Sequence, residues 1–322
     1  MPRLRRSDSS AGGLGRVRSG KGFSYRDPVG IVIKDPHVRD RIVALSIPPA
    51  WTEVWIAPYA NGHIQATGVD AAGRTQYVYH SAWRKQKDRL KFDRVIALAE
   101  TLPAARRKVT VGLRENDPTK TRGLAAAFRL LDTGAMRVGS ERYLEEHGSR
   151  GLSTLLCSQV SISGDVISFA FPGKSLQEWA SVVQDAELAG VLRGLKRRGP
   201  RARLLAYKDG THWRSISAED INQFVREKTE GDYTAKDFRT LQGTVTAAIA
   251  LARTGPQKTA PARKRAVAQV MREVAEVLGN TPAVARSSYV DPRIVDRFDR
   301  GQTIDPSKTA SAESQLREML SE

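Results

Sequence analysis

The pattern of apolar and polar residues changes in character about a quarter of the way along this 322-residue chain. Before that point, short apolar runs alternate with polar residues as half-buried strands do, and glycine-containing turns separate them. These runs cover residues 53–56, 64–68 and 75–80. From Ser81 onward apolar residues recur at helical spacing, for example over 124–131. The pattern therefore predicts a small β-rich domain followed by a larger, mainly α domain.

One stretch of the second part interrupts the helical pattern. Val160 and Ile162 alternate with polar residues, and the apolar runs 166–171 and 176–183 each follow a glycine-containing turn. This predicts a short three-stranded sheet inside the mainly α domain. Helical spacing then resumes, and the best-patterned helix ends at Gly279, a residue type common just beyond helix C-termini. The expected fold class is α+β.

Charge is the feature that departs most from an average soluble protein. Lysine and arginine number 52 against 35 aspartates and glutamates, so that the formal net charge is +17. Such an excess creates an extended positive field, for which nucleic acid is the usual polyanionic partner. A membrane surface is the rival partner, but no run approaches the ~18 apolar residues of a spanning helix. We therefore expect a nucleic-acid-binding protein without a membrane segment.

Composition also suggests the domain boundaries. Residues 1–24 are rich in Arg, Ser and Gly, so we expect a basic disordered arm that touches DNA, although a transit peptide has a similar composition. The β-rich domain is expected over 25–90, the mainly α domain over 91–300, and a C-terminal tail over 301–322. The single cysteine, Cys157, excludes an internal disulfide, fits a reducing cytoplasm and is expected to be buried.

Five scattered residues suggest covalent chemistry on a DNA phosphate. They are Arg137 in Met-Arg-Val-Gly-Ser, Lys174 in Pro-Gly-Lys-Ser, Arg239 in Asp-Phe-Arg-Thr, Asn280 after the helix-ending glycine, and Tyr289 beyond a Thr-Pro helix start. Arginine forks can bind the non-bridging oxygens of a phosphate. A tyrosine becomes a nucleophile beside cations, and a lysine of lowered pKa can protonate the leaving oxygen. The five histidines show no metal-ligand spacing, so no metal is expected.

The segment Pro172-Gly173-Lys174-Ser175 also invites comparison with a phosphate-binding P-loop. A P-loop requires glycine five residues before Gly173, where this chain has Ser168. Strand patterns also flank the segment on both sides, whereas a P-loop opens a helix. No ATP site and no cofactor are therefore expected.

The five residues in this order resemble those of the type IB DNA topoisomerases, of the compact poxvirus-like kind found in bacteria. The resemblance covers roughly residues 47–298 and implies a catalytic domain of the tyrosine recombinase and type IB topoisomerase fold. It implies that Tyr289 attacks a phosphodiester, forms a 3′-phosphotyrosyl link and expels the 5′-oxygen. The duplex then swivels and the reaction reverses, which relaxes positive and negative supercoils without ATP. Lys174 would be the general acid, while Arg137 and Arg239 would stabilise the transition state.

The resemblance also implies roles for residues that touch DNA. Asn280 stands where some family members have histidine, so it would bind a phosphate oxygen without titrating. The residues that resemble DNA-contacting positions are Gln76, Tyr77 and Tyr79 in the β-rich domain and Ser140, Arg142 and Tyr143 after the first arginine. Together they imply a monomer that clamps around double-stranded DNA. Such an enzyme would be cytoplasmic and associated with the nucleoid.

Other interpretations stay open at this stage. Taken singly, Tyr289 is an ordinary helix residue, Arg137 a surface charge and Lys174 an exposed turn lysine. A tyrosine recombinase shares the chemistry, but such enzymes usually carry His-x-x-Arg where this chain has Lys236-Asp237-Phe238-Arg239. The remaining alternative is a non-catalytic basic protein that packs DNA.

Overall fold

The computed structural model describes residues 3–173 and 176–321. The chain divides into two compact units, residues 1–91 and 92–322, a division next to the expected boundary between residues 90 and 91. The first unit is rich in strands and the second is mainly helical. This confirms the α+β class that the sequence predicts.

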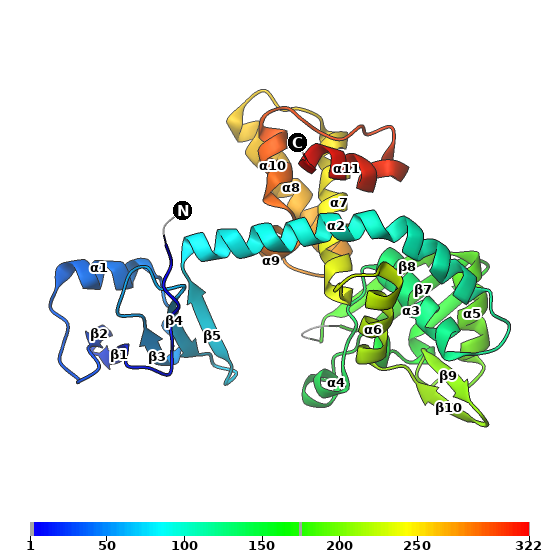
Figure 1. Ribbon diagram of the computed structural model, residues 1–322, viewed down its shortest axis with the longest axis horizontal. Helices are drawn as coiled ribbons and strands as arrows, with labels where there is room; N and C mark the ends of the chain where they lie inside the picture. The colour runs from blue at the N-terminus through cyan, green and yellow to red at the C-terminus, as the bar shows by residue number, and fades with distance from the viewer. Residues whose placement is uncertain (1–2, 174–175, 322) are drawn as a thin grey trace. The chain divides into compact units, whose positions relative to one another are not determined.

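A five-stranded antiparallel sheet with strand order β2-β1-β3-β4-β5 builds the first unit (Figure 1). Its elements are β1 (Leu14–Ser19), β2 (Gly22–Arg26), α1 (Pro36–Ala44), β3 (Thr52–Ile56), β4 (Ile64–Val69) and β5 (Thr75–Tyr79). Asp35 caps α1 by accepting from the backbone of His37, and Pro36 supplies the first helical residue. The core joins Ile42 of α1 to apolar side chains of the central strands, namely Leu14, Val54, Ile56 and Ala66.

The prediction of a disordered arm over residues 1–24 is wrong for β1 and for most of β2. β1 lies inside the sheet between β2 and β3, and Leu14 is buried in the core. The guanidinium of Arg16 donates to the backbone carbonyls of Ile47, Pro48 and Trp51. Arg16, which lies in the predicted DNA-binding arm, therefore holds the loop before β3 through hydrogen bonds.

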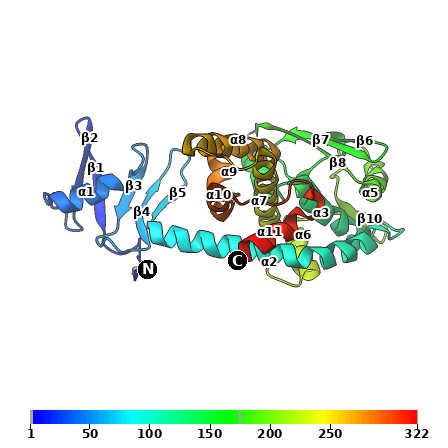
Figure 2. The ribbon, with the colours of Figure 1, turned by 90° about the horizontal axis from the view of Figure 1, so that it is seen from above.

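The second unit contains most of the long helix α2 (Ser81–Leu113), which is a single rod in both views (Figures 1 and 2). Its other α-helices are α3 (Lys120–Gly134), α4 (Glu141–His147), α5 (Ala186–Lys196), α6 (Ala218–Thr229), α7 (Ala235–Thr254), α8 (Ala260–Leu278), α9 (Pro282–Ser288), α10 (Pro292–Asp299) and α11 (Ala312–Ser321). Short 3-10 turns are η1 (Leu152–Thr154), η2 (Cys157–Gln159) and η4 (Thr309–Ser311).

The short three-stranded sheet of the second unit forms as expected. Its strands are β6 (Val160–Ser163), β7 (Val166–Pro172) and β8 (Glu178–Gln184), in the order β6-β7-β8. A separate hairpin of β9 (Ala206–Asp209) and β10 (His212–Ser215) was not expected. All four residues of β10 are exposed, so its sequence carries no alternating apolar pattern.

Helix α7 contributes to both core clusters of the second unit. Its first half places Phe238 among the side chains of α2, α3, the three-stranded sheet, α5 and α6, where its ring lies 5.2 Å from that of Phe128. Its second half, including Leu251, packs with α8, α9, α10 and α11, which gather around it in Figure 2. Residues on α7 are therefore held rigidly from both sides.

The prediction of a C-terminal tail over 301–322 is also wrong. α11 buries Leu316 completely in the second core cluster. Glu313 forms an ion pair with Arg106 of α2 at 2.7 Å, and Arg317 pairs with Glu100 at 2.5 Å. The helix α11 is thus a packed part of the second unit.

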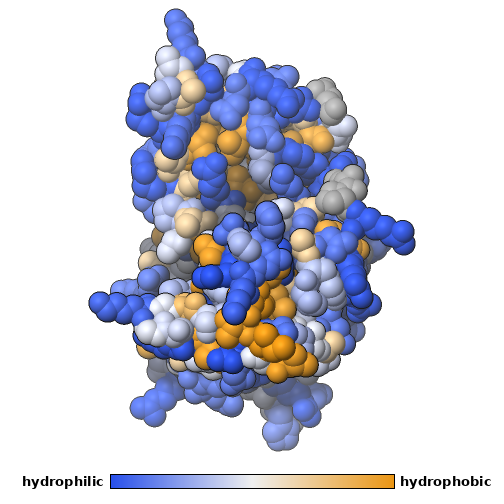
Figure 3. All heavy atoms as spheres, turned by 90° about the vertical axis from the view of Figure 1, so that its left-hand side faces the viewer, coloured by the Kyte–Doolittle hydropathy of each residue, from blue (hydrophilic) through white to orange (hydrophobic). Residues whose placement is uncertain are grey.

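The face drawn in Figure 3 is mostly hydrophilic, with apolar side chains visible in patches. Large exposed apolar side chains of the first unit include Val29, Ile31 and Val43. Among the described residues, no helix combines the length and the apolar character needed to cross a membrane.

Candidate active site

One face of α7 forms the platform of the candidate site. Lys236, Arg239 and Gly243 are spaced by three and four residues, so they lie on the same side of the helix. The helix begins at Thr234, whose backbone N–H and hydroxyl donate to the carboxylate of Asp237 at 2.8 and 3.0 Å. This capping interaction sets the first turn of the helix, in which Lys236 lies three residues before Arg239.

The guanidinium of Arg239 is buried, with only 3% of the residue exposed. It donates to the carbonyl of Leu278 at 2.7 Å and to that of Ala135, and so connects the C-terminal ends of α8 and α3. Its Nε is buried and finds no hydrogen-bond partner among the described residues. Such a group can donate a hydrogen bond to a ligand that enters the site.

Arg137 lies in the segment that follows α3. Ala135 ends that helix in the left-handed conformation, with φ of 51°, and the Arg137 carbonyl accepts from the N–H of Leu152 at 2.9 Å. Gly139 has φ of 76°, and a Cβ there would come within 2.8 Å of the Gly151 backbone. Two closely packed glycines therefore hold the backbone that presents Arg137.

Arg137 contacts Asn280 directly. Its Nη2 donates to Oδ1 of Asn280 at 2.6 Å and to the carbonyl of Gly279 at 3.1 Å. Gly279 ends α8 in the left-handed conformation, as the sequence predicts, and Asn280 follows it. The Nδ2 group of Asn280 is buried and has no partner within the described part of the chain.

Tyr289 lies at the junction of α9 and α10. Thr281 caps α9 with Pro282 as its first residue, and the N–H of Tyr289 donates to the Ala285 carbonyl at 3.0 Å. The Thr244 hydroxyl of α7 donates to the Tyr289 carbonyl at 3.0 Å. The chain then turns into α10, so the tyrosine backbone is fixed from two sides.

The Tyr289 side chain faces the buried arginine of α7. The guanidinium carbon of Arg239 lies 5.2 Å from the centre of the tyrosine ring. A Cβ on Gly243 would approach the Tyr289 carbonyl oxygen to 2.8 Å and the Tyr289 Cβ to 3.0 Å. The lack of a side chain at Gly243 therefore allows the tyrosine to lie close against α7.

The electrostatics of the site favour an ionised phenol. Burial alone would raise the pKa of Tyr289, but the charges of Arg239, Arg137 and Lys236 lower it by more, so its pKa lies below the ordinary value. Burial, followed by repulsion from Arg137, lowers the pKa of Arg239 to about 10, and burial also lowers the pKa of Arg137. The described residues provide no carboxylate partner for either arginine.

Arg137, Lys236, Arg239 and Tyr289 line a cleft of about 420 Å³ in the second unit, whereas Asn280 does not line it. Its lining residues are Arg137, Val138, Gly139, Ser140, Tyr143, Ser149, Arg150, Ala235, Lys236, Arg239 and Tyr289. Lys236 and Arg150 were not among the predicted site residues. The spacing of Lys236, three residues before Arg239, could have indicated from the sequence that both residues lie at the site. Nothing in the sequence indicated that Arg150 lies there. The cleft is positively charged and large enough for a phosphodiester.

Comparison with known proteins assigns the family. A family model described as "Eukaryotic DNA topoisomerase I, catalytic core" matches residues 80–313, and one described as "Bacterial DNA topoisomerase IB, N-terminal domain" matches residues 22–70. The chain belongs to the type IB DNA topoisomerases. This confirms the resemblance, and the enzyme is an isomerase that acts on DNA.

Two relatives of this topoisomerase illustrate the extent of the match. DNA topoisomerase 1B of Acanthamoeba polyphaga mimivirus is 31% identical over 293 residues, which cover 86% of this chain and 85% of the viral protein. DNA topoisomerase 1 beta of Arabidopsis thaliana is 25% identical over 208 residues, which cover 64% of this chain and 22% of the plant protein.

The predicted general acid of the topoisomerase, Lys174, lies outside the described residues. The residues on either side of it are paired: the N–H of Gly173 donates to the Gln177 carbonyl at 2.8 Å, and the N–H of Leu176 donates to the Gly173 carbonyl at 3.0 Å. The connection between β7 and β8 is therefore closed at its base by backbone hydrogen bonds.

Ser140, Arg142 and Tyr143 differ in their relation to the cleft. Ser140 and Tyr143 line it, and the Ser140 hydroxyl also caps α4 by accepting from the Tyr143 N–H at 3.3 Å. Arg142 does not line the cleft; it is largely exposed and forms an ion pair with Glu146 at 2.8 Å. The structure thus brings two of these three predicted DNA-contacting residues to the site.

The predicted DNA-contacting residues of the first unit lie on β5. Tyr77 and Tyr79 share one face of the strand, with their rings stacked 5.8 Å apart and 44% and 38% of each residue exposed. Gln76 points to the other face, where its amide donates to Asp70 at 2.8 Å. The two tyrosines therefore form an exposed aromatic pair that does not include Gln76.

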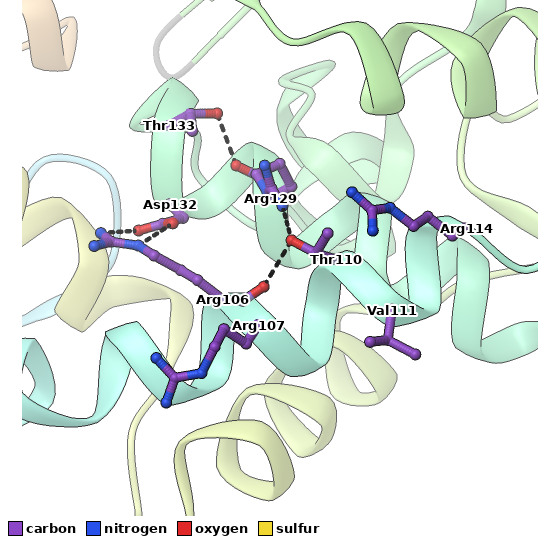
Figure 4. Close-up of a pocket in the computed structure, with 8 residues that line it drawn as sticks. All are labelled: Arg106, Arg107, Thr110, Val111, Arg114, Arg129, Asp132 and Thr133. Carbon is purple, nitrogen blue, oxygen red and sulfur yellow. Dashed lines mark hydrogen bonds and ion pairs between the residues drawn. The ribbon is translucent and has the colours of Figure 1, made fainter.

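A larger hollow of about 570 Å³ lies on α2 and α3 of the second unit (Figure 4). Its lining residues are Arg106, Arg107, Thr110, Val111, Arg114, Arg129, Asp132 and Thr133. Arg106 is paired with Asp132 and Glu313, while Arg129 donates to Asp185 at 2.8 Å and to Thr110 at 2.7 Å. Carboxylates thus neutralise Arg106 and Arg129, and these two guanidinium groups form structural ion pairs.

Proposed function

We propose that this topoisomerase relaxes DNA supercoils of either sign by joining one cut strand transiently to Tyr289. The observation that carries the proposal is the placement of the Tyr289 ring 5.2 Å from the guanidinium carbon of Arg239, a cation without a carboxylate partner in the described chain. A half-buried phenol in this positive field is prepared to lose its proton and attack phosphorus. The covalent link conserves the energy of the cut bond, so no ATP is consumed.

In the proposed cleavage step, the Tyr289 hydroxyl releases its proton to solvent, its oxygen forms a bond to phosphorus, and the bond from phosphorus to the 5′-oxygen breaks. The phosphate stays on the 3′ end of the cut strand. The leaving 5′-oxygen takes a proton, and the family resemblance implies that Lys174 supplies it. After the duplex has rotated, the 5′-hydroxyl attacks the phosphotyrosyl bond, returns its proton and restores both the strand and the tyrosine.

Three side chains are proposed to bind the non-bridging phosphate oxygens, on which charge increases in the transition state. Arg137 and Arg239 supply permanent positive charge, and Asn280 supplies a neutral donor. The buried, unpartnered Nε of Arg239 and Nδ2 of Asn280 support this role, because a buried donor without an acceptor is unfavourable until a ligand satisfies it.

A clamp around duplex DNA is proposed from surfaces of both units. The stacked pair Tyr77 and Tyr79 would contact base edges and sugar, and Ser140 and Tyr143 would contact the strand beside the cleft. Gln76 and Arg142 could join them only by exchanging their present partners Asp70 and Glu146. The enzyme would act as a monomer in the cytoplasm, at the nucleoid.

Trapping the covalent intermediate tests the proposal. The purified protein is mixed with supercoiled plasmid, quenched with detergent and examined for protein-linked nicked DNA, and relaxation is measured in parallel. We expect both signals from the wild type as a monomer, and neither from Tyr289→Phe, which should still bind DNA.

Two outcomes would contradict the assignment. Adduct formation by Tyr289→Phe would place the nucleophile elsewhere. Activity that appears only in tetramers on paired DNA sites would favour a recombinase, while binding without any adduct would favour a DNA-packing protein.

A further inference from the structure

Trp179 of β8 contacts the backbone that presents Asn280. A Cβ built on Gly279 would lie 2.6 Å from Cδ1 and 3.0 Å from Nε1 of the Trp179 indole, so the edge of the ring packs directly on this glycine. Trp179 is only 7% exposed. Gly279 has φ of 56°, and its left-handed conformation turns the chain from α8 toward Asn280.

The same glycine is in contact with Arg137. Its carbonyl accepts from Nη2 of Arg137 at 3.1 Å, and the next residue, Asn280, accepts from the same nitrogen at 2.6 Å. The other terminal nitrogen of Arg137 lies 3.9 Å from the position of a Gly279 Cβ. Trp179 and Arg137 therefore both contact the turn at Gly279, the indole through packing and the guanidinium through hydrogen bonds.

Trp179 is itself rigidly held. It stands opposite Phe171 in the β7–β8 register, with ring centres 5.0 Å apart. Its Cβ also lies 3.2 Å from the position of a Cβ on Gly173. The indole thus joins the three-stranded sheet to the turn between α8 and α9. The residues on either side of that turn, Leu278 and Ala285, pack in the second core cluster.

We infer that Trp179 is a positioning residue for DNA cleavage, which holds the Gly279–Asn280 turn so that the Asn280 amide keeps its orientation toward the scissile phosphate. This inference rests on the proposed function, because it assigns Asn280 to phosphate binding. A tryptophan that only filled the core would affect stability, whereas a positioning residue changes the rate of cleavage through Asn280. The two roles differ in how they couple to a substitution of Asn280.

A double-mutant cycle separates these roles. Single-turnover cleavage, DNA binding and thermal unfolding are measured for Trp179→Phe in the wild-type chain and in the Asn280→Ala chain. We expect Trp179→Phe to slow cleavage about 10-fold with DNA binding within about 2-fold, since a small displacement at a reacting centre is costly. In the Asn280→Ala chain the same substitution should slow cleavage by less than about 2-fold.

Phe169→Leu provides the matched control, because Phe169 is buried in the same core cluster. It should lower the unfolding temperature while cleavage stays within about 2-fold of the wild type, as expected for a core substitution. If Trp179→Phe does not fold, Gly279→Ala disturbs the same contact from the other side. It should slow cleavage in the wild-type chain, but by less than about 2-fold in the Asn280→Ala chain.

An equal penalty for Trp179→Phe in both chains, or no penalty at all, would overturn the inference. Failure of the proposed function would look different: the wild type would form no adduct, Tyr289→Phe would still form one, or Asn280→Ala alone would cleave at the wild-type rate.

Discussion

Nη2 of Arg137 donates a 2.6 Å hydrogen bond to Oδ1 of Asn280. This contact fixes the orientation of the Asn280 amide, because an arginine can only donate and therefore pairs with the amide oxygen. The Nδ2 group is left as the free donor. Arg137 thus both contributes charge and orients a neighbouring neutral donor.

Substitutions of Asn280 should follow from this orientation. Asn280→Ala should slow cleavage about 10²- to 10³-fold, the usual cost of losing one transition-state donor. Asn280→Asp should be slower still, because its carboxylate can accept from Arg137 but repels phosphate. Asn280→His should retain more activity than either, since an imidazole can donate. Single-turnover cleavage rates test this order, and an Asp variant faster than Ala would contradict it.

Gly243→Ala should impair catalysis without impairing the helix that carries it. The added Cβ would lie 2.8 Å from the Tyr289 carbonyl oxygen and push the nucleophile away from α7. We expect cleavage to slow by about 10- to 100-fold. Gly190→Ala on α5 is the matched control, because nothing lies within 4 Å of a Cβ there. That variant should cleave normally, and equal behaviour of the two variants would disprove the role of Gly243.

The pH dependence of cleavage should report the lowered pKa of Tyr289. Because the proposed nucleophile is the phenolate, we expect the rate to rise with pH and to reach its plateau below the ordinary tyrosine pKa of about 10. Lys236→Met removes one of the lowering charges and should move the midpoint to higher pH, with a larger loss at pH 7 than at pH 9. An unchanged midpoint would exclude Lys236. Lys264→Met on α8 serves as the lysine control.

A tetrahedral anion should stabilise the free enzyme. Burial disfavours the charged forms of Arg137 and Arg239, and no carboxylate of the described chain offsets this. Sulfate at 100 times its Kd would add about 2.7 kcal/mol to the free energy of unfolding. The increase in Tm, measured against chloride at equal ionic strength, should vanish in Arg137→Ala and persist in Arg226→Ala. Its persistence in both variants would place the anion elsewhere.

Lys174 can be tested as the general acid by changing the leaving group. Lys174→Ala should slow cleavage of ordinary DNA, and a substrate with sulfur in place of the 5′-oxygen should recover much of the loss, because a thiolate leaves without a proton. A sulfur effect of equal size in the variant and in the wild type would remove Lys174 from this role.

Local signals in the sequence were sufficient to place several parts of the site. Thr281-Pro282 predicted the start of α9 and Gly279 the end of α8, because capping depends on residues adjacent in the chain. The alternating pattern around Val160 and Ile162 likewise predicted the three-stranded sheet. These elements form for reasons contained within a few residues.

Other features depend on contacts between distant segments and left no local trace. Arg16 looks like part of a basic arm, but it is bound to carbonyls of a loop about 30 residues later. The close approach of Gly243 to Tyr289 and the pairing of Arg137 with Asn280 join segments that only the folded core brings together. Periodicity reports which face of an element is buried, not which partner covers it.

The burial of Leu316 and the pairing of Glu313 with Arg106 make α11 part of the support of the site. This helix packs in the same core cluster as the second half of α7 and as Ala285 and Ile294, which lie on either side of Tyr289. Truncation of the chain before α11 would therefore open that cluster and loosen the framework that holds the proposed nucleophile.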